Sequence, residues 1–182
     1  MTTSTGRRRR TRAEARAETR TAILAAAWQL FTERGYRGAS LDEIADVAGF
    51  SKGAVYSNWP SKEALFLELL DAARSEQATD TLSTQPTGWA LATLDFFVEA
   101  VRSPDTRGML ADRYREARRS LAPGLAQGRP EPTWVTWEEL ATVAMALGSG
   151  LIIQAAIDDR AVDPGLIERV MQHLLDAARE SE

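Results

Sequence analysis

Apolar side chains recur at intervals of three and four residues along most of the chain, and no segment alternates between apolar and polar positions as a half-buried strand does. Near the front, Ile23, Ala27 and Leu30 repeat at helical spacing and would share one face of a helix. We therefore expect a helix over about 13–34, ended by Gly35. The pattern continues to the end of the chain and predicts an all-α fold of about nine helices.

Residues that favour helix ends mark where the following helices begin and end. Ser40 and Glu43 have the spacing of a capping box, in which each side chain satisfies a backbone amide of the other residue's turn. Gly49 would end this short helix, Ser51 would begin the next one, and Pro60 would end that one. Further stripes and caps predict helices over about 61–76, 91–101, 110–121, 136–158 and 163–178, with a Pro- and Gly-rich connection over 123–132 that has room for a frayed helical turn.

Composition excludes several classes of function. The chain has no cysteine and a single histidine, His173, so thiol catalysis, disulfide scaffolds, zinc fingers and His-rich metal centres are excluded. Neither a dinucleotide-binding GxGxxG run nor a phosphate-binding P-loop occurs. The acidic pairs 138–139 and 158–159, and the pair His173 and Asp176, are better explained as surface or helix-end charges than as acid–base or metal sites. We expect neither an enzyme nor a bound cofactor or metal.

Charge is distributed unevenly along the chain. Residues 1–65 hold 11 Lys and Arg against 7 Asp and Glu, a balance of +4, whereas residues 66–182 hold 11 against 19, a balance of −8. A basic segment is an electrostatic signature of nucleic-acid binding even in an acidic chain. The apolar stretch 143–157 is interrupted by small and polar residues and is shorter than the roughly 20 residues that cross a bilayer. We expect it to be a buried helix, and the protein to be cytoplasmic and free of membrane contact.

Two short helices joined by a tight glycine turn, after a longer first helix, have the organisation of a helix-turn-helix, whose later helix enters the DNA major groove. Gly49 would make the corner, and Ala45, Phe50 and Val55 would hold the two helices over the first one. Spacing alone leaves two other interpretations open. One is an ordinary capped hairpin in a helical bundle, and the other is a helical adaptor that binds protein.

The residues themselves are more specific than their spacing. The run Ser40-Leu-Asp-Glu-Ile-Ala-Asp-Val-Ala-Gly-Phe-Ser-Lys-Gly-Ala-Val-Tyr-Ser-Asn-Trp-Pro-Ser-Lys-Glu-Ala-Leu65 closely resembles the DNA-binding domain of TetR-family transcriptional regulators. Residues 21–36 resemble that family's first helix, and, more weakly, 146–154 and the last helix resemble its dimerising pair. The resemblance implies a three-helix helix-turn-helix DNA-binding domain over 13–60 and an α-helical ligand-binding and dimerisation domain over 61–182.

The resemblance also implies which residues meet double-stranded DNA. In this sequence they are Ser40, Lys52, Gly53, Ala54, Tyr56, Ser57, Asn58 and Lys62. A hydroxyl at a helix N-terminus suits a phosphate oxygen, lysine suits a phosphate or a base edge, and alanine suits a thymine methyl group. Asn58 and Trp59 stand where many members carry His or Tyr and Phe, so no operator sequence follows from the resemblance.

The segment 1–12 has no apolar period and is expected to be a disordered, Arg-rich arm. Arg7, Arg8, Arg9 and Arg10 are an addition to the family pattern. On a flexible arm they would pair with phosphates or enter an adjacent minor groove. The alternative is a tail that only aids solubility.

The implied function is that of a repressor that binds a near-palindromic operator as a homodimer and is released by a small-molecule effector. Aromatic and methionine side chains give adaptable apolar walls; the candidates to line the effector site are Trp89, Phe96, Phe97, Met109, Tyr114, Trp134, Trp137 and Met145. The candidates for an intersubunit four-helix bundle are Leu140, Leu147, Gly148, Leu151, Ile167, Val170, Met171 and Leu174. For both sets the alternative is an ordinary core within one chain.

Overall fold

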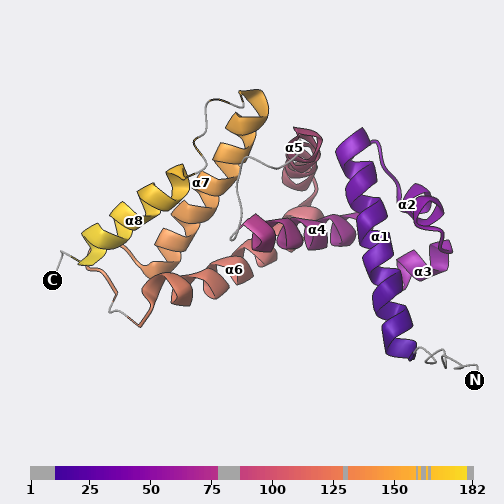
Figure 1. Ribbon diagram of the computed structural model, residues 1–182, viewed down its shortest axis with the longest axis horizontal. Coiled ribbons are helices and arrows are strands. Elements are labelled where there is room, and N and C mark those ends of the chain that lie inside the picture. The colour runs from indigo at the N-terminus through magenta and orange to yellow at the C-terminus, as the bar shows by residue number, and fades with distance from the viewer. Residues whose placement is uncertain are drawn as a thin grey trace, which may run out of the picture.

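The computed structural model describes residues 11–77, 87–128, 131–158, 160, 163 and 165–179, without the side chains of 74–77, 167, 178 and 179. Every regular element within these residues is an α-helix, so the fold is all-α as predicted (Figure 1). The helices are α1 (Arg12–Arg34), α2 (Leu41–Ala48), α3 (Lys52–Tyr56), α4 (Lys62–Gln77), α5 (Thr87–Arg102), α6 (Pro104–Ala126), α7 (Trp137–Ile157) and α8 (Leu166–Arg179).

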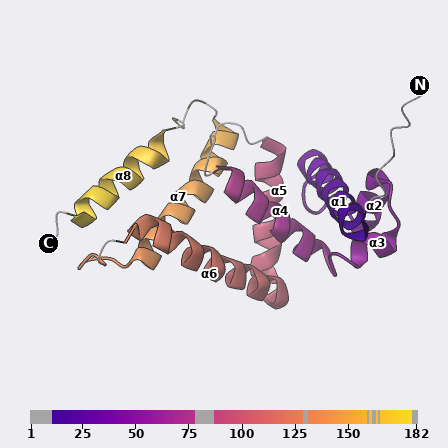
Figure 2. The same cartoon turned by 60° about the horizontal axis from the view of Figure 1, so that its bottom comes forward.

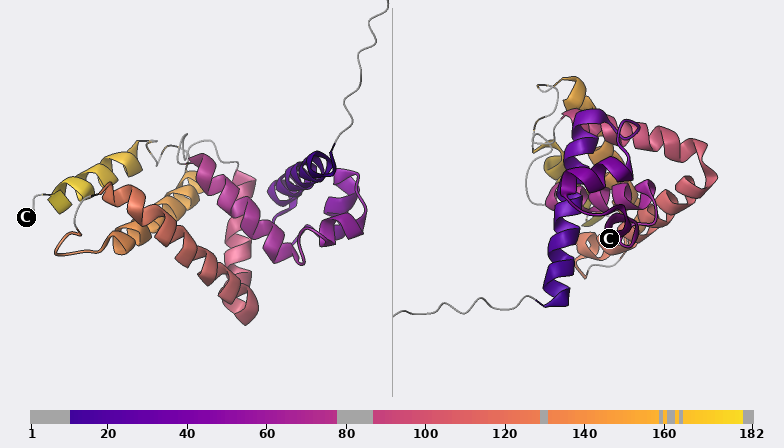
Figure 3. Two further views of the ribbon diagram at one scale, coloured as in Figure 1. Left: turned by 90° about the horizontal axis from the view of Figure 1, so that it is seen from below. Right: turned by 90° about the vertical axis from the view of Figure 1, so that its right-hand side faces the viewer.

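The helices form an elongated body with two distinct ends. Helices α1, α2 and α3 make one end, and α7 and α8 make the other (Figures 1 and 2). Helices α4, α5 and α6 lie between these ends, and α8 lies outermost alongside α7 (Figure 3). Any influence of the α7–α8 end on the α1–α3 end must therefore pass through the three central helices.

The predicted caps of the second and third helices are present. The Ser40 and Glu43 side chains form a capping box with each other's backbone amides at the start of α2. Gly49 ends α2 in the left-handed conformation, with φ 73° and ψ 27°, which glycine adopts without the steric penalty that other residues incur. The Ser51 hydroxyl accepts a hydrogen bond from the amide of Ala54 at the start of α3. These local signals fix the corner between α2 and α3.

Several helix boundaries differ from those predicted. Helix α5 begins at Thr87 rather than near 91, and α6 begins at Pro104 rather than near 110. Thr11 and Glu14 form a further capping box, so α1 begins at Arg12, inside the segment that was expected to be disordered. Helix α6 continues through Pro123 to Ala126, where a connection was predicted. Proline removes one helical N–H but its φ is compatible with a helix, and the next turn is kept because the Gln127 amide donates to the Pro123 carbonyl at 3.0 Å. The described residues consequently form eight helices rather than nine.

A single aromatic core joins the first three helices to α4 and α5. The Phe66 ring of α4 lies 5.0 Å from the ring of Phe31 on α1 and 4.7 Å from that of Phe96 on α5, measured between ring centroids. Trp28 of α1 stacks on Trp89 of α5 with centroids 4.2 Å apart. The core that supports α2 and α3 thus extends into the central helices.

Helix α5 approaches α1 closely at one glycine. A Cβ atom on Gly88 would lie 2.0 Å from the backbone carbonyl oxygen of Thr32, a distance that no side chain tolerates. The absence of a side chain at this position lets the two helices pack against each other directly.

Helix α7 is not the buried helix that was predicted. Its buried side chains are Trp137, Leu140 and Ala141, all in its first two turns, where they pack with Ala122 of α6. By length and composition alone α7 is long and apolar enough to cross a membrane. This is weak evidence, because core helices of soluble proteins meet the same two criteria. Beyond these turns α7 instead presents an apolar face that the described residues leave partly exposed.

Candidate DNA-binding surface

Helix α2 begins at a capping box in which the Ser40 hydroxyl is already hydrogen-bonded. This hydroxyl accepts a hydrogen bond from the Glu43 amide at 3.3 Å and donates one to the Glu43 carboxylate at 2.8 Å. Together with the bond from the Ser40 amide and the nearby Arg34 guanidinium, these contacts hold the pKa of Glu43 below its usual value. Ser40 would have to release Glu43 before its hydroxyl could donate to a phosphate.

The short helix α3 exposes the side on which the predicted DNA contacts lie. Lys52, Gly53, Tyr56 and Ser57 are exposed, and Tyr56 is 51% exposed. Val55, on the opposite side, is fully buried and anchors the helix to the core. The arrangement is that of a recognition helix, with one side packed on its support and the other side open to a partner.

Two further predicted contact residues brace the end of α3. The Ser57 hydroxyl and the Asn58 amide nitrogen both donate to the carbonyl oxygen of Ala54, at 3.0 and 2.8 Å. This bond uses one of the two N–H donors of the Asn58 amide, so the other donor and the side-chain oxygen can still bind a partner. Ala54 and Asn58 are half-buried.

Lys52, the first residue of α3, is held by an acidic residue of α2. Its ammonium group forms an ion pair with Asp42, and this contact raises the pKa of Lys52, with a smaller contribution from Asp46. Both partners are largely exposed, so water screens the attraction. The pair ties the two helices of the corner together through their outer surfaces.

Lys62 lies at the start of α4 and makes internal contacts. Its ammonium group donates to the carbonyl oxygens of Tyr36 and Ala39 at 2.9 and 3.0 Å, and lies 4.2 Å from the centre of the Tyr36 ring. Burial lowers the pKa of Lys62, an effect that neighbouring carboxylates oppose. The Tyr36 hydroxyl in turn donates to Glu63 at 2.8 Å, and burial together with this carboxylate raises the pKa of Tyr36. Lys62 thus fastens α4 to the loop between α1 and α2.

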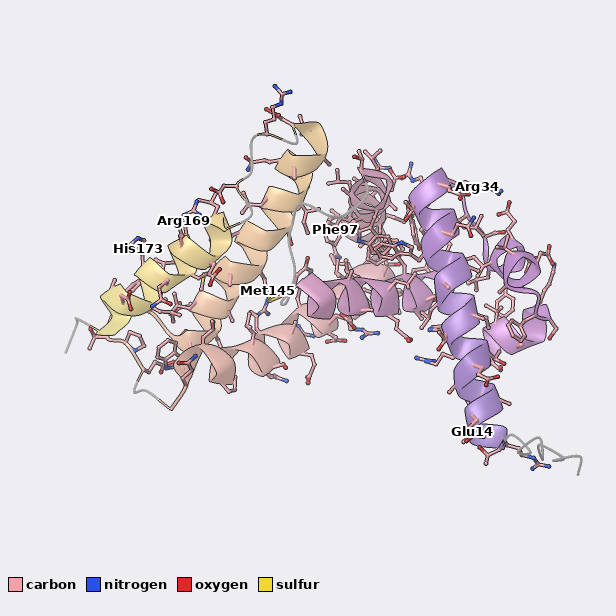
Figure 4. All side chains as sticks on the ribbon, viewed as in Figure 1. Glu14, Arg34, Phe97, Met145, Arg169 and His173 are labelled. Atoms are coloured by element: carbon pink, nitrogen blue, oxygen red, sulfur yellow. The ribbon has the colours of Figure 1, made fainter. Side chains whose placement is uncertain are left out.

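The predicted arginine arm is described only at its end. Arg7, Arg8, Arg9 and Arg10 lie outside the described residues. Arg12 is the first residue of α1, near Glu14 at the end of the helix farthest from Arg34 (Figure 4).

The residues predicted to line an effector site do not share one cavity. Trp89 and Phe96 are buried in the aromatic core, Trp137 is buried between α6 and α7, and Trp134 is 51% exposed. Phe97 projects from α5 and contacts Tyr114 of α6, with ring centroids 6.5 Å apart, whereas Met145 belongs to α7 (Figure 4).

Met109 is the predicted residue that does line a cavity. This open pocket between α4 and α6 has a volume of about 380 Å³, and its lining residues are Ala64, Leu67, Met109, Asp112, Arg113 and Glu116. The charged residues were missed, although their spacing along α6 places them on one helix face with Met109. Arg113 pairs with Asp71 of α4, and Asp112 pairs with Arg115.

The predicted dimer residues fall into two groups. Leu140 and Met171 are buried within the chain itself, at 1% and 8% exposure, and so offer little surface to a second chain. Leu147, Gly148, Leu151, Val170 and Leu174 remain partly exposed, and the side chain of Ile167 lies outside the described set. A shallow groove of about 300 Å³ runs along the uncovered face of α7, lined by Val143, Ala146, Leu147, Gly150, Leu151 and Gln154.

The residues weighed for other chemistry have ordinary structural surroundings. Glu139 serves the capping box at the start of α7, and its pKa is lowered by the hydrogen bonds from Thr136. His173 is exposed on α8 (Figure 4), and Asp176 accepts a hydrogen bond from Gln172 at 3.1 Å. In the described part of the chain, no group of three or more His, Cys, Asp or Glu side chains is placed to hold a metal ion.

Comparison with known proteins agrees with this geometry. Residues 23–69 match the family profile "Bacterial regulatory proteins, tetR family", and residues 67–180 match that of "BetI-type transcriptional repressor, C-terminal". The chain is 49% identical over 69 residues to the HTH-type transcriptional repressor BepR of Brucella suis biovar 1; the match covers 38% of this chain and about a third, 32%, of the relative.

Solved structures resemble nearly the whole chain. Salmonella enterica GusR has a TM-score of 0.63 and 23% identity, covering 88% of this chain and 95% of the other. A putative transcriptional regulator from Saccharomonospora viridis, solved in complex with choline, has a TM-score of 0.54 and 26% identity, with the same coverage. Since the profiles together span residues 23–180, and the second alone spans more than half of the chain, the protein belongs to the TetR family of DNA-binding transcriptional regulators.

Proposed function

We propose that the protein is a repressor that binds a near-palindromic DNA operator as a homodimer and is released by a small-molecule effector. The observation that carries the proposal is the exposed side of α3. Lys52, Tyr56 and Ser57 are open to solvent there, while the buried Val55 anchors the helix to the core. The match to a repressor profile and the repressor BepR support the sign of regulation. In this proposal residues 13–60 bind DNA, residues 61–182 bind the effector and the second subunit, and the protein acts in the cytoplasm without being an enzyme.

The proposed DNA contacts are those of the α2–α3 corner together with the arm. Lys52, Tyr56, Ser57 and Asn58 would meet the major groove and its phosphates, and residues 7–10 would add phosphate contacts. Ser40 and Lys62 would bind DNA only by giving up hydrogen bonds within the protein, because each already has internal partners. Their contribution to DNA affinity would be coupled to the stability of the corner.

The proposed dimer is formed by the uncovered faces of α7 and α8. Leu147 and Leu151 line an apolar groove of α7, and a Cβ on Gly148 would meet no atom within 4 Å, so this face has room for another helix. An apolar helix face of this kind is stabilised when a second copy buries it. Two recognition helices in such a dimer would read half-sites about 34 Å apart.

The proposed effector site is the cavity between α4 and α6. Its volume of about 380 Å³ falls in the range of small-molecule sites, about 300–1,000 Å³. The carboxylates of Asp112 and Glu116 line it together with the apolar side chains of Leu67 and Met109. Arg113 is paired with Asp71 and Asp112 with Arg115, so Glu116 is the lining carboxylate on which a cation would depend most. This environment favours a small organic cation, and the choline bound by the Saccharomonospora viridis protein belongs to that class.

A binding experiment tests the proposal. Labelled duplex DNA from upstream of the protein's own gene is titrated with the protein, and choline or its uncharged carbon isostere dimethylbutanol is then added. We expect one retarded complex with the stoichiometry of a dimer, and release by choline but not by the isostere. A tenfold loss of affinity corresponds to about 1.4 kcal/mol of coupling between the two sites. A protein that binds no duplex preferentially would overturn the operator proposal, and a complex unaffected by choline would overturn the choice of effector.

A reporter gene placed behind the same DNA determines the sign of regulation. In a strain that lacks the protein we expect higher expression, which supplying the protein lowers. The opposite response would show an activator and overturn the repressor assignment.

A further inference from the structure

One carboxylate of α4 holds both the end of the recognition helix and α1. Glu68 accepts a hydrogen bond from the indole nitrogen of Trp59 at 2.7 Å and forms an ion pair with Arg20 of α1. The Arg20 guanidinium also lies over the Trp59 ring, 4.7 Å from its centroid. Three elements of the fold therefore meet at a single side chain.

Trp59 transmits the position of Glu68 to the recognition helix. The Trp59 amide donates to the carbonyl oxygen of Val55 at 2.9 Å, so its backbone continues directly from the last turn of α3. Its side chain is 2% exposed and packs in the core that holds Val55. A buried side chain tied at both ends has little freedom to rotate, and a shift of Glu68 would carry Trp59 and the end of α3 with it.

Glu68 lies close along α4 to the residues that contact α6. It is one helical turn from Ala64, which lines the cavity between α4 and α6, and three residues from Asp71, which pairs with Arg113 of α6. Its side chain is 26% exposed, so its interactions are less screened than those of the Lys52–Asp42 pair.

We propose that Glu68 is a positioning residue for DNA recognition, whose carboxylate sets the orientation of α3 through the Trp59 indole. It acts on specificity because base contacts depend on where the recognition helix points, whereas attraction to phosphates depends mainly on charge. Loss of the Glu68–Trp59 hydrogen bond therefore weakens binding to the preferred sequence more than binding to other DNA.

The test compares two affinities for each of several variants. A duplex enriched from a random library by the wild-type protein serves as the specific site, and a scrambled duplex serves as the non-specific one. Trp59→Phe removes the N–H group but keeps an aromatic ring, and Glu68→Met removes the acceptor but keeps the length. We expect each to lower the ratio of specific to non-specific affinity about tenfold, the size of one hydrogen bond to a charged group.

Three controls separate positioning from a general structural effect. Glu68→Gln keeps an acceptor oxygen and should retain the ratio within about threefold. The double variant Trp59→Phe with Glu68→Met should be no worse than Glu68→Met alone, because Glu68→Met already removes the hydrogen bond to the indole along with the Arg20 ion pair. The salt dependence of non-specific binding should stay as in the wild type in Trp59→Phe, since no phosphate contact is lost.

The outcomes are distinct. Unchanged ratios in Trp59→Phe and Glu68→Met, or parallel losses of both affinities, would overturn the role of Glu68 while leaving the proposed function intact. If the wild-type protein enriches no sequence, the proposed operator function fails, and this inference fails with it.

Discussion

Asp42 and Lys52 form an ion pair across the outer side of the α2–α3 corner, so the first charged group of the recognition helix already has an anionic partner in the absence of DNA. A phosphate oxygen must compete with Asp42 for the same ammonium group. The pair thus reduces the attraction of Lys52 to any DNA backbone it meets.

Replacing Asp42 with asparagine should strengthen DNA binding, because Lys52 becomes available and a carboxylate that repels phosphate is removed. Exposed pairs of this kind are worth about 0.2–1 kcal/mol, so we expect a rise in affinity of a few fold. The slope of log affinity against log salt should steepen by about one phosphate contact. Fluorescence anisotropy at several salt concentrations measures both quantities. Glu138→Gln, which removes an exposed carboxylate of α7, is the matched control. An identical slope for the two variants would contradict the prediction.

Replacing Lys62 with methionine should lower both stability and DNA affinity. The carbonyl groups of Tyr36 and Ala39 would lose their shared donor, at a cost of about 1–3 kcal/mol in the free energy of unfolding. Urea unfolding followed by circular dichroism measures this change. Lys52→Met is the comparison, because Lys52 is exposed and its loss should reduce affinity with little effect on stability. Unchanged stability in Lys62→Met would leave Lys62 with a role at the DNA alone.

The capping box of α2 should make stability depend on pH in the acid range. The pKa of Glu43 is lowered in the folded protein, so its contribution is complete above the ordinary value of 4.5 and is lost as the pH falls through the folded-state value. Glu43→Gln should therefore be less stable than the wild type at neutral pH, and the difference should shrink on acidification. Urea unfolding over a series of pH values tests this, and a difference that stays constant with pH would refute it.

Gly88→Ala should destabilise the protein because the added Cβ meets the Thr32 carbonyl oxygen at 2.0 Å, a backbone atom that cannot move aside cheaply. Overpacking of this kind costs about 1–3 kcal/mol. Gly108→Ala is the matched control within another helix, where a Cβ meets nothing within 4 Å and the change should stabilise by about 0.4–1 kcal/mol. Thermal unfolding of the two variants should shift in opposite directions, and shifts of the same sign would contradict the packing of α5 on α1.

Leu151→Asp should convert the proposed dimer into a monomer, because it places a charge in the apolar groove of α7. The molar mass measured by static light scattering should fall from twice the chain mass of 20.0 kDa to that mass. Val101→Asp, at a side chain of α5 that is 68% exposed, should remain dimeric. A wild-type protein that is monomeric at micromolar concentration would overturn the dimer.

Local features of this fold were predictable from the sequence, because caps and turns depend on residues only three or four positions apart. Ser40, Gly49, Ser51 and Thr136 all have the helix-end roles that their types predict. The continuation of α6 through Pro123 was not predicted, because it depends on packing with α7 that no local pattern records.

The site was less predictable where a residue type suits two environments. Aromatic residues such as Trp89 and Phe96 serve a core as well as a ligand pocket, and here they pack in the core. The partners of Lys62 are backbone carbonyls, which every residue carries, so no sequence pattern could identify them. The Trp59–Glu68–Arg20 contacts bring together α1, α4 and the connection after α3, and their proximity is a property of the tertiary fold.

The stacking of Trp28 on Trp89, with centroids 4.2 Å and planes 26° apart, gives the protein an intrinsic optical reporter. Two indoles this close share their electronic excitation, and the resulting circular dichroism signal vanishes when the rings separate. Because one ring sits on α1 and the other on α5, unlabelled protein would report any sliding between these helices as a spectral change.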